Sequence, residues 1–285
     1  MRLWVASLCF YVSIFIFCEI LRGFAYRFEL HTQIGGEHHQ QFTSLIYEFI
    51  GTVQLCAPMF DVNFVMDNYG LSGVFLEIVL IELVNAFLFQ RAFADPCQLF
   101  YNYMKGSHSM IYSSLLLAVQ FIAAYASWLL SRQFFALNLH SQHINAFEEE
   151  CSADLTVAIL YGSIVEALGL FAGKFVDFCI EKRALSPTHA NVINAICSGI
   201  ITILGINITG MYANPIVAWA LTFNCKGISH LGHISVYWLA PICAFFATKT
   251  AFGDGNDQQE EVEKSFDESG KLAKPTNVSG TKKVN

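Results

Sequence analysis

The sequence has 285 residues, of which 54% are hydrophobic and 14% are charged, and its formal net charge is −7. Its mean hydropathy of +0.46 is too high for an ordinary soluble domain, so the composition indicates an integral membrane protein. Metal-ligand clusters, nucleophile elbows and phosphate-binding glycine loops are absent from the sequence, so we expect no enzymatic activity, no cofactor, no metal site and no nucleic-acid partner.

Seven apolar stretches are long enough to cross about 30 Å of hydrocarbon as helices that rise about 1.5 Å per residue. They lie at 3–21, 42–60, 72–89, 109–130, 155–175, 191–209 and 235–252. The first stretch could also be a signal peptide, but it lacks a clear small-residue cleavage site and carries Glu19 near its end, which favours a retained anchor.

Residues 1–41 are expected to form this first span and a cytoplasmic linker. The linker holds His31, His38 and His39, which could respond to pH, although solvated side chains without a special role are the simpler interpretation.

Two glutamates precede two Pro turns at nearly equal spacing. Glu48 lies 47 positions before Asp95-Pro96-Cys97, and Glu166 lies 48 positions before Asn214-Pro215-Ile216. A fixed internal period predicts a repeated architecture, and in a membrane protein it suggests inverted repeats that meet at the bilayer midplane. We therefore expect a channel domain at 42–252 with repeats at 42–130 and 154–252.

Asp95 and Asn214 are good N-cap residues, and each is followed by Pro at the first helical position. The helices that they start, near 96–104 and 215–223, are too short to span a bilayer but could dip half-way from opposite faces. Backbone of this kind survives at membrane depth only where it is buried or lines a water-filled cavity. One such turn alone is usually a plain turn, so it is the matched pair that favours a pore, with two positive helix ends at its centre.

Glu48 and Glu166 lie inside apolar runs, where a carboxylate needs a buried partner. We expect the backbone N–H groups of the loops before the short helices to be those partners. Glu77 and Glu82 are candidate pore or partner residues, and an internal hydrogen bond to loop backbone is an equal alternative for each. Most of the nine cysteines are expected to be packing residues, but Cys151 and Cys225 fall on the external side and could pair or react.

The basic residues set the expected orientation. If the first span runs from outside to inside, 13 of the 16 Lys and Arg residues are cytoplasmic and 3 are external, as the positive-inside rule requires. The connection 131–153 is then external or lumenal. The tail 253–285 is polar and is expected to be disordered in the cytosol. It ends with Lys282 and Lys283, which resemble a dilysine retrieval signal or are a chance pair.

Taken together, these motifs resemble the aquaporin family. The run Glu48–Thr52 resembles the first-span motif, Gln120 matches a third-span position, 236–241 resembles the sixth-span signature, and the Pro turns replace the two Asn-Pro-Ala boxes. The run 221–225, the Thr209-Gly210 pair, Cys97 and the extra N-terminal span are similar to the superaquaporin branch of eleven and twelve type.

This resemblance covers 42–252 and implies an all-α membrane fold of six tilted spans and two re-entrant half-helices, plus the extra span. It further implies a homo-oligomer, commonly a tetramer with one pore per subunit. With the dilysine pair, we expect the endoplasmic reticulum or another intracellular membrane, with the plasma membrane as the alternative.

By spacing, the resemblance implies a selectivity filter at Phe75, Thr202, Met211 and Val217, for all of which ordinary packing is the alternative. Orthodox water channels carry Arg where this chain has Val217, and no substitute cation is visible nearby in the sequence. The filter is therefore expected to be wider and more apolar, and to pass water and small neutral solutes such as glycerol or hydrogen peroxide. The loss of this charge would also weaken the barrier to protons and cations.

Asp95 departs from the box Asn, because an ionised Asp only accepts hydrogen bonds whereas a protonated one also donates. Cys97 and Ile216 replace the small Ala of each box. These departures keep two alternatives open: a membrane scaffold that does not conduct, and a pore that leaks protons or cations.

Overall fold

The computed structural model describes residues 1–31, 37–89, 91–148 and 150–253. The expected tail, with Lys282 and Lys283, lies outside these residues, and the side chains of the three linker histidines are not described.

Helices make up nearly all of the described chain. Within its ranges we find no β-strand, only an isolated bridge between Ser152 and Lys226. The long helices are α1 (Leu3–His31), α2 (Glu37–Cys56), α3 (Val62–Leu88), α5 (Met110–Phe135), α7 (Ile159–Lys182) and α8 (Pro187–Thr209). The shorter elements are η1 (Pro58–Asp61), α4 (Pro96–Met104), α6 (Ser141–Glu148), α9 (Pro215–Thr222) and the continuous run of α10 (His230–Ile234), η2 (Ser235–Leu239) and α11 (Ala240–Phe252). The expected all-helical class is confirmed.

Six stretches of helix in the described ranges are long and apolar enough to cross a membrane. The sequence predicted seven spans, and the difference lies in one run of 49 residues, Gln40–Leu88, which contains α2, η1 and α3. This run is interrupted twice. Pro58 opens the 3-10 turn η1, and Gly70 breaks α3 with a φ of 64°, a conformation that glycine adopts without steric cost.

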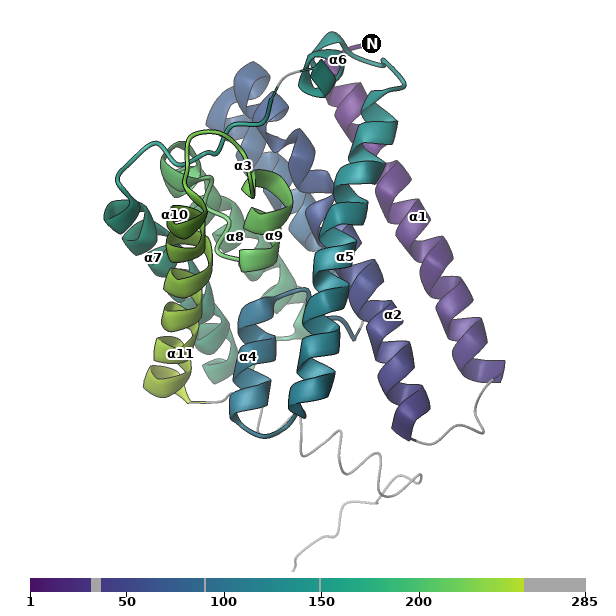
Figure 1. Cartoon of the computed structure of the whole chain (residues 1–285), viewed down its shortest axis with the longest axis vertical. Coiled ribbons are helices and arrows are strands. Elements are labelled where there is room, and N and C mark those ends of the chain that lie inside the picture. Colours follow the sequence, from purple (N-terminus) through teal and green to yellow (C-terminus); the bar gives the residue numbers. More distant parts are fainter. Residues whose placement is uncertain (32–36, 90, 149, 254–285) are drawn as a thin grey trace, which may run out of the picture.

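The bundle is assembled from neighbouring helix pairs. Residues of α2 contact α5, α3 contacts α8, and α7 contacts both α8 and α11. The short helices α4 and α9 contact each other as well as α5, and Figure 1 shows α4 low in the bundle and α9 higher.

α1 lies at one edge of the bundle and packs on α2 (Figure 1). Its two faces differ in burial. One face is exposed and apolar, at Trp4, Leu8, Val12, Ile16, Ile20 and Phe24. The other face is buried, at Ala6, Phe10, Ile14, Cys18, Arg22 and Ala25. A helix that exposes an apolar stripe of this length suits a lipid surface, and Arg22 is the one cation within its buried face.

Candidate functional site

Glu48 of α2 holds the loop that leads into α4. Its carboxylate is 1% exposed and accepts hydrogen bonds from the backbone N–H groups of Phe93 and Ala94, both at 2.8 Å. The side chain of Gln120 on α5 donates a third bond at 2.6 Å. Asp95 then caps α4, because its carboxylate accepts from the Cys97 N–H at 2.8 Å.

Glu166 of α7 holds the second loop in the same way. Its carboxylate accepts from the N–H groups of Tyr212, at 3.2 Å, and Ala213, at 2.8 Å, and from the Thr209 hydroxyl at 2.6 Å. Asn214 caps α9 by accepting from the Ile216 N–H at 3.0 Å. The expected partners of both glutamates, loop N–H groups, are thus the ones that the structure shows.

The two loops also match in backbone conformation. Asp95 and Asn214 have φ −145° with ψ 112° and 118°, and the residues before them, Ala94 and Ala213, have positive φ of 45° and 47°. A positive φ is uncommon for alanine, so each glutamate helps to hold a strained loop. The two loops that the sequence period relates therefore have nearly the same backbone dihedral angles.

The N-terminal ends of α4 and α9 meet. The Asn214 side-chain amide donates to the backbone carbonyl oxygen of Ala94 at 2.9 Å. Cys97 and Ile216, the residues that follow the two prolines, are fully buried. Cys97 packs with Leu170 and Phe245, and Ile216 packs in a cluster of its own with α2 and α5 residues.

Two cavities adjoin this junction. The first has a volume of about 470 Å³ and is lined by Asp95, Lys174 and Asp177, among others. The second has a volume of about 490 Å³ and is lined by Asp154 and Val217, among others. Both cavities share the lining residues Leu55, Glu82, Ser198, Thr202, Met211, Tyr212 and Asn214.

The four expected filter residues differ in their position relative to the two cavities. Thr202 and Met211 line both cavities, and Val217 lines the second. Phe75 is not among the lining residues of either cavity. It packs where α3 and α8 approach closely, since a Cβ added to Gly199 would lie 3.0 Å from the Phe75 Cδ2 atom.

The Met211 side chain occupies space between α7 and α8. A Cβ added to Gly205, or one added to Gly169, would overlap the end of this side chain. Two glycines on neighbouring helices therefore leave the room that Met211 fills.

Several cavity residues were not assigned by sequence reasoning. Lys174 lines the first cavity with Asp95, because residues distant in sequence meet there. Lys174 pairs with Asp177 at 3.2 Å. Glu82, left open between two roles, lines both cavities, whereas Glu77 contacts the hydroxyl of Tyr11 instead.

Asp154 lies at the second cavity, outside the spans. Its carboxylate accepts hydrogen bonds from the Tyr212 hydroxyl and, at 3.3 Å, from the Asn63 amide. Burial raises the pKa of the Asp154 carboxyl above its ordinary value, and these two hydrogen bonds oppose the shift. The only sequence signal was an acid just before an apolar stretch.

Cys151 and Cys225 form a disulfide, which settles the alternatives left open for them. It joins the segment before α7 to the segment after α9, and the Lys226 N–H donates to the Cys151 carbonyl at 3.0 Å beside it. Cys151 also lines the second cavity. The bond therefore ties together two segments at the edge of this cavity.

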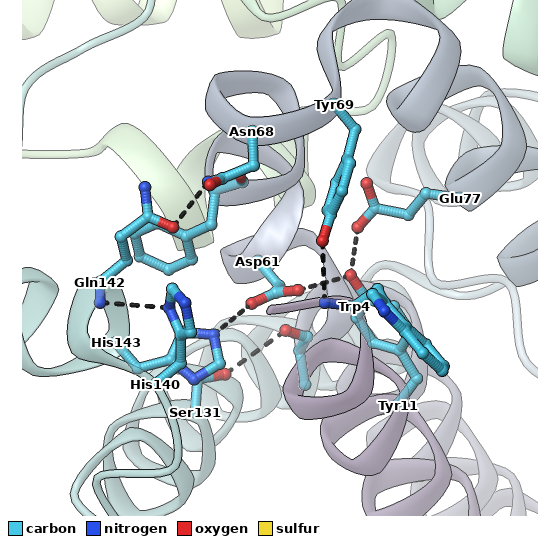
Figure 2. A network of polar contacts seen from close by, with 12 residues as sticks. Trp4, Tyr11, Asp61, Asn68, Tyr69, Glu77, Ser131, His140, Gln142 and His143 are labelled. Carbon is cyan, nitrogen blue, oxygen red and sulfur yellow. Dashed lines mark hydrogen bonds and ion pairs between the residues drawn. The ribbon is translucent and has the colours of Figure 1, made fainter. Parts of the chain in front are cut away.

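A separate polar network joins α1 to η1, α3 and α6 (Figure 2). Asp61, which is fully buried, contacts the His143 Nε2 atom at 2.8 Å and accepts from the Tyr11 hydroxyl at 2.7 Å. Glu77 contacts the same hydroxyl. None of these four residues lines the two cavities, so the network holds elements together rather than facing the candidate pore.

No protein-family model matches the sequence. Among curated proteins, the chain is 28% identical to aquaporin-11 of Milnesium tardigradum over 199 residues, which cover 69% of this chain and 71% of that protein. It is 24% identical to aquaporin-11 of Homo sapiens, covering 70% and 73%, and 22% identical to aquaporin-12 of Mus musculus, covering 83% and 81%. The predicted resemblance to aquaporins of the superaquaporin type is confirmed, and these relatives support a membrane channel for water or small solutes.

Proposed function

We propose that this chain forms a superaquaporin-type channel for passive flow of water and small neutral solutes, with glycerol and hydrogen peroxide in the expected size class. The observation that carries the proposal is the matched pair of loops. Two buried glutamates each hold two consecutive backbone N–H groups, and the helices that follow meet end to end between two cavities.

In this proposal α4 and α9 are the re-entrant half-helices. Each presents the positive end of its dipole to the junction, which disfavours cations and orients water. Asn214 lines both cavities, and a primary amide has two N–H groups. One of them donates to Ala94, so the second is free to serve a passing oxygen atom.

The filter region is proposed to lack a fixed cation. Val217 and Met211 offer apolar surface, and Thr202 offers a hydroxyl whose proton goes to the Ser198 carbonyl at 2.9 Å. Such a lining is poor in donors and suits neutral solutes. We also propose a homotetramer in an intracellular membrane, on the strength of the aquaporin resemblance and the dilysine pair.

The test is stopped-flow light scattering on proteoliposomes that contain the purified protein. The variant Asn214→Leu loses the cap of α9 and the bond to Ala94, so we expect it to lower water and glycerol flux at least about tenfold towards that of empty liposomes. Asn207→Leu, an exposed position on α8, is the matched control and should conduct as the parent does.

Flux of the parent equal to that of empty liposomes, with the protein folded, would refute the channel and favour the scaffold. Equal flux of the parent and Asn214→Leu would place the conduction path elsewhere.

A further inference from the structure

The buried face of α1 carries a cation that reaches into the bundle. Arg22 is 4% exposed, and its guanidinium contacts Glu19 on the same helix and donates to the Oε1 atom of Gln54 on α2 at 2.5 Å. Gln54 in turn donates from Nε2 to the Oδ1 atom of Asn85 on α3 at 2.9 Å. These side chains form a continuous buried path across three helices.

The direction of this path is fixed at its start. A guanidinium has donors only, so Gln54 must turn its carbonyl oxygen towards Arg22 and its NH₂ group towards Asn85. Asn85 must then accept through its own oxygen. Its NH₂ group is therefore the one left over at the far end, and the orientation of both amides follows from the chemistry of Arg22 alone.

The far end of the path lies at a cavity. Asn85 lines the first cavity and is itself 4% exposed, and its Nδ2 atom has no hydrogen-bond partner among the residues that the structure describes. A buried N–H without an acceptor is costly, so the cavity contents are the natural partner. Glu82, one turn earlier on the same face of α3, also lines this cavity.

We propose that Asn85 is a selectivity residue of the channel, whose N–H groups donate to the oxygen atoms of hydroxyl-bearing neutral solutes in the first cavity. Arg22 and Gln54 are the positioning residues that keep this donor facing the cavity. The inference rests on the proposed channel function and gives α1 a part in it. Asn85 thus supplies a hydrogen-bond donor in the first cavity, whereas the apolar Val217 supplies none in the second.

The decisive variant is Gln54→Glu, which reverses the direction of the hydrogen bond to Asn85 and hardly changes the volume of the side chain. A carboxylate at 54 accepts from Arg22 and also from Asn85, so the Asn85 amide turns and offers its carbonyl to the cavity. Because the new carboxylate pairs with Arg22, this variant should remain folded. Gln133→Glu, at an exposed position on α5, is the same change in a place that does not face either cavity.

In proteoliposomes, we expect Gln54→Glu and Asn85→Ala each to lower glycerol permeability about fivefold, and the ratio of glycerol to water flux to fall with it. That factor corresponds to about 1 kcal/mol, the net value of one hydrogen bond. The double variant should be no lower than Asn85→Ala, since Gln54 acts through Asn85. Arg22→Lys keeps a donor-only group and should stay within about twofold of the parent.

Two results would overturn the inference while the channel stands: glycerol flux of Gln54→Glu equal to that of Gln133→Glu, or effects of Gln54→Glu and Asn85→Ala that multiply in the double variant. Absence of flux in the parent would instead refute the channel function, and this inference with it.

Discussion

At the residue scale, the carboxylates of Glu48 and Glu166 hold the two loops because they offer only hydrogen-bond acceptors to the loop N–H groups. Glu48 and Glu166 each receive three hydrogen bonds, and two of these come from consecutive loop N–H groups. A buried carboxylate is tolerated where several donors surround it. The same chemistry explains why neither glutamate needs a cationic partner.

Glu166→Gln replaces one of these acceptor oxygens with an NH₂ group that faces backbone donors. We expect this to lower the free energy of unfolding by about 1–3 kcal/mol, because at least one buried N–H loses its acceptor. Flux should fall with it, since Met211 to Asn214 line the cavities. Thermal unfolding in detergent and proteoliposome flux measure the two effects. Glu181→Gln, at an exposed position on the same helix, should change neither stability nor flux. If the two variants behave alike, Glu166 does not hold the loop through its acceptor oxygens.

Asp95 is the residue at which the alternative of a leaky pore can be tested. It lines the first cavity as an acid beside the junction of α4 and α9. If the pore leaks cations, Asp95→Asn removes the attracting charge and supplies an amide donor, so proton conductance should fall while neutral solute flux stays within about twofold. A pH-sensitive dye inside the liposomes reports this, with the exposed Asp67→Asn as the control. Loss of both fluxes together would argue against the leak.

At the scale of elements, the approach of α7 and α8 sets the position of Met211. The glycines Gly169 and Gly205 leave room for its side chain, and this side chain lines both cavities. The lumen is thus shaped by the absence of two β-carbons on neighbouring helices. A change in either glycine acts on the cavity through Met211.

Gly205→Ala is therefore expected to narrow the pore without unfolding the protein. The added methyl group overlaps the flexible end of Met211, which lines both cavities, so we expect this side chain to be displaced into them. Alanine in a helix also favours folding by up to about 1 kcal/mol over glycine. We expect lower glycerol flux with an unfolding temperature equal to the parent's or higher. Gly23→Ala, in open space on α1, serves as the control. A less stable variant with normal flux would show that the Met211 side chain is not displaced into the cavities.

At the scale of the whole molecule, the features that repeat along the chain were predictable and those that depend on helix rotation were not. The caps at Asp95 and Asn214 and the partners of the two glutamates follow from local chemistry. Whether Glu77 or Glu82 faces a cavity depends on how α3 is rotated and kinked at Gly70, which an all-round apolar helix does not reveal. Phe75 was placed in the filter by spacing from a family pattern, and that placement stays a prediction; in the structure its ring lies close to Gly199 of α8.

The position of α1 is likewise decided by buried polar contacts that its apolar sequence hides. Two of these sets are Arg22 with Gln54 on α2, and Tyr11 with Asp61 and Glu77 (Figure 2). Hydrogen bonds of this kind specify how a helix is rotated and how deep it lies in the bundle. Apolar packing against other apolar helices specifies both poorly. The N-terminal helix is thereby fixed against η1 and α3 as well as α2.

Tyr11→Phe separates this docking role from conduction. It removes the one hydroxyl that contacts both carboxyls, so Asp61 and Glu77 lose a partner inside the bundle, and we expect the unfolding temperature to fall by several degrees. Tyr26→Phe is the matched control, because that ring is 60% exposed on the same helix. Since Tyr11 lines neither cavity, solute flux through folded protein should be unchanged. Lower flux at an unchanged unfolding temperature would mean that the N-terminal half of α1 acts on the pore itself, and the network of Figure 2 would then belong to the conduction mechanism.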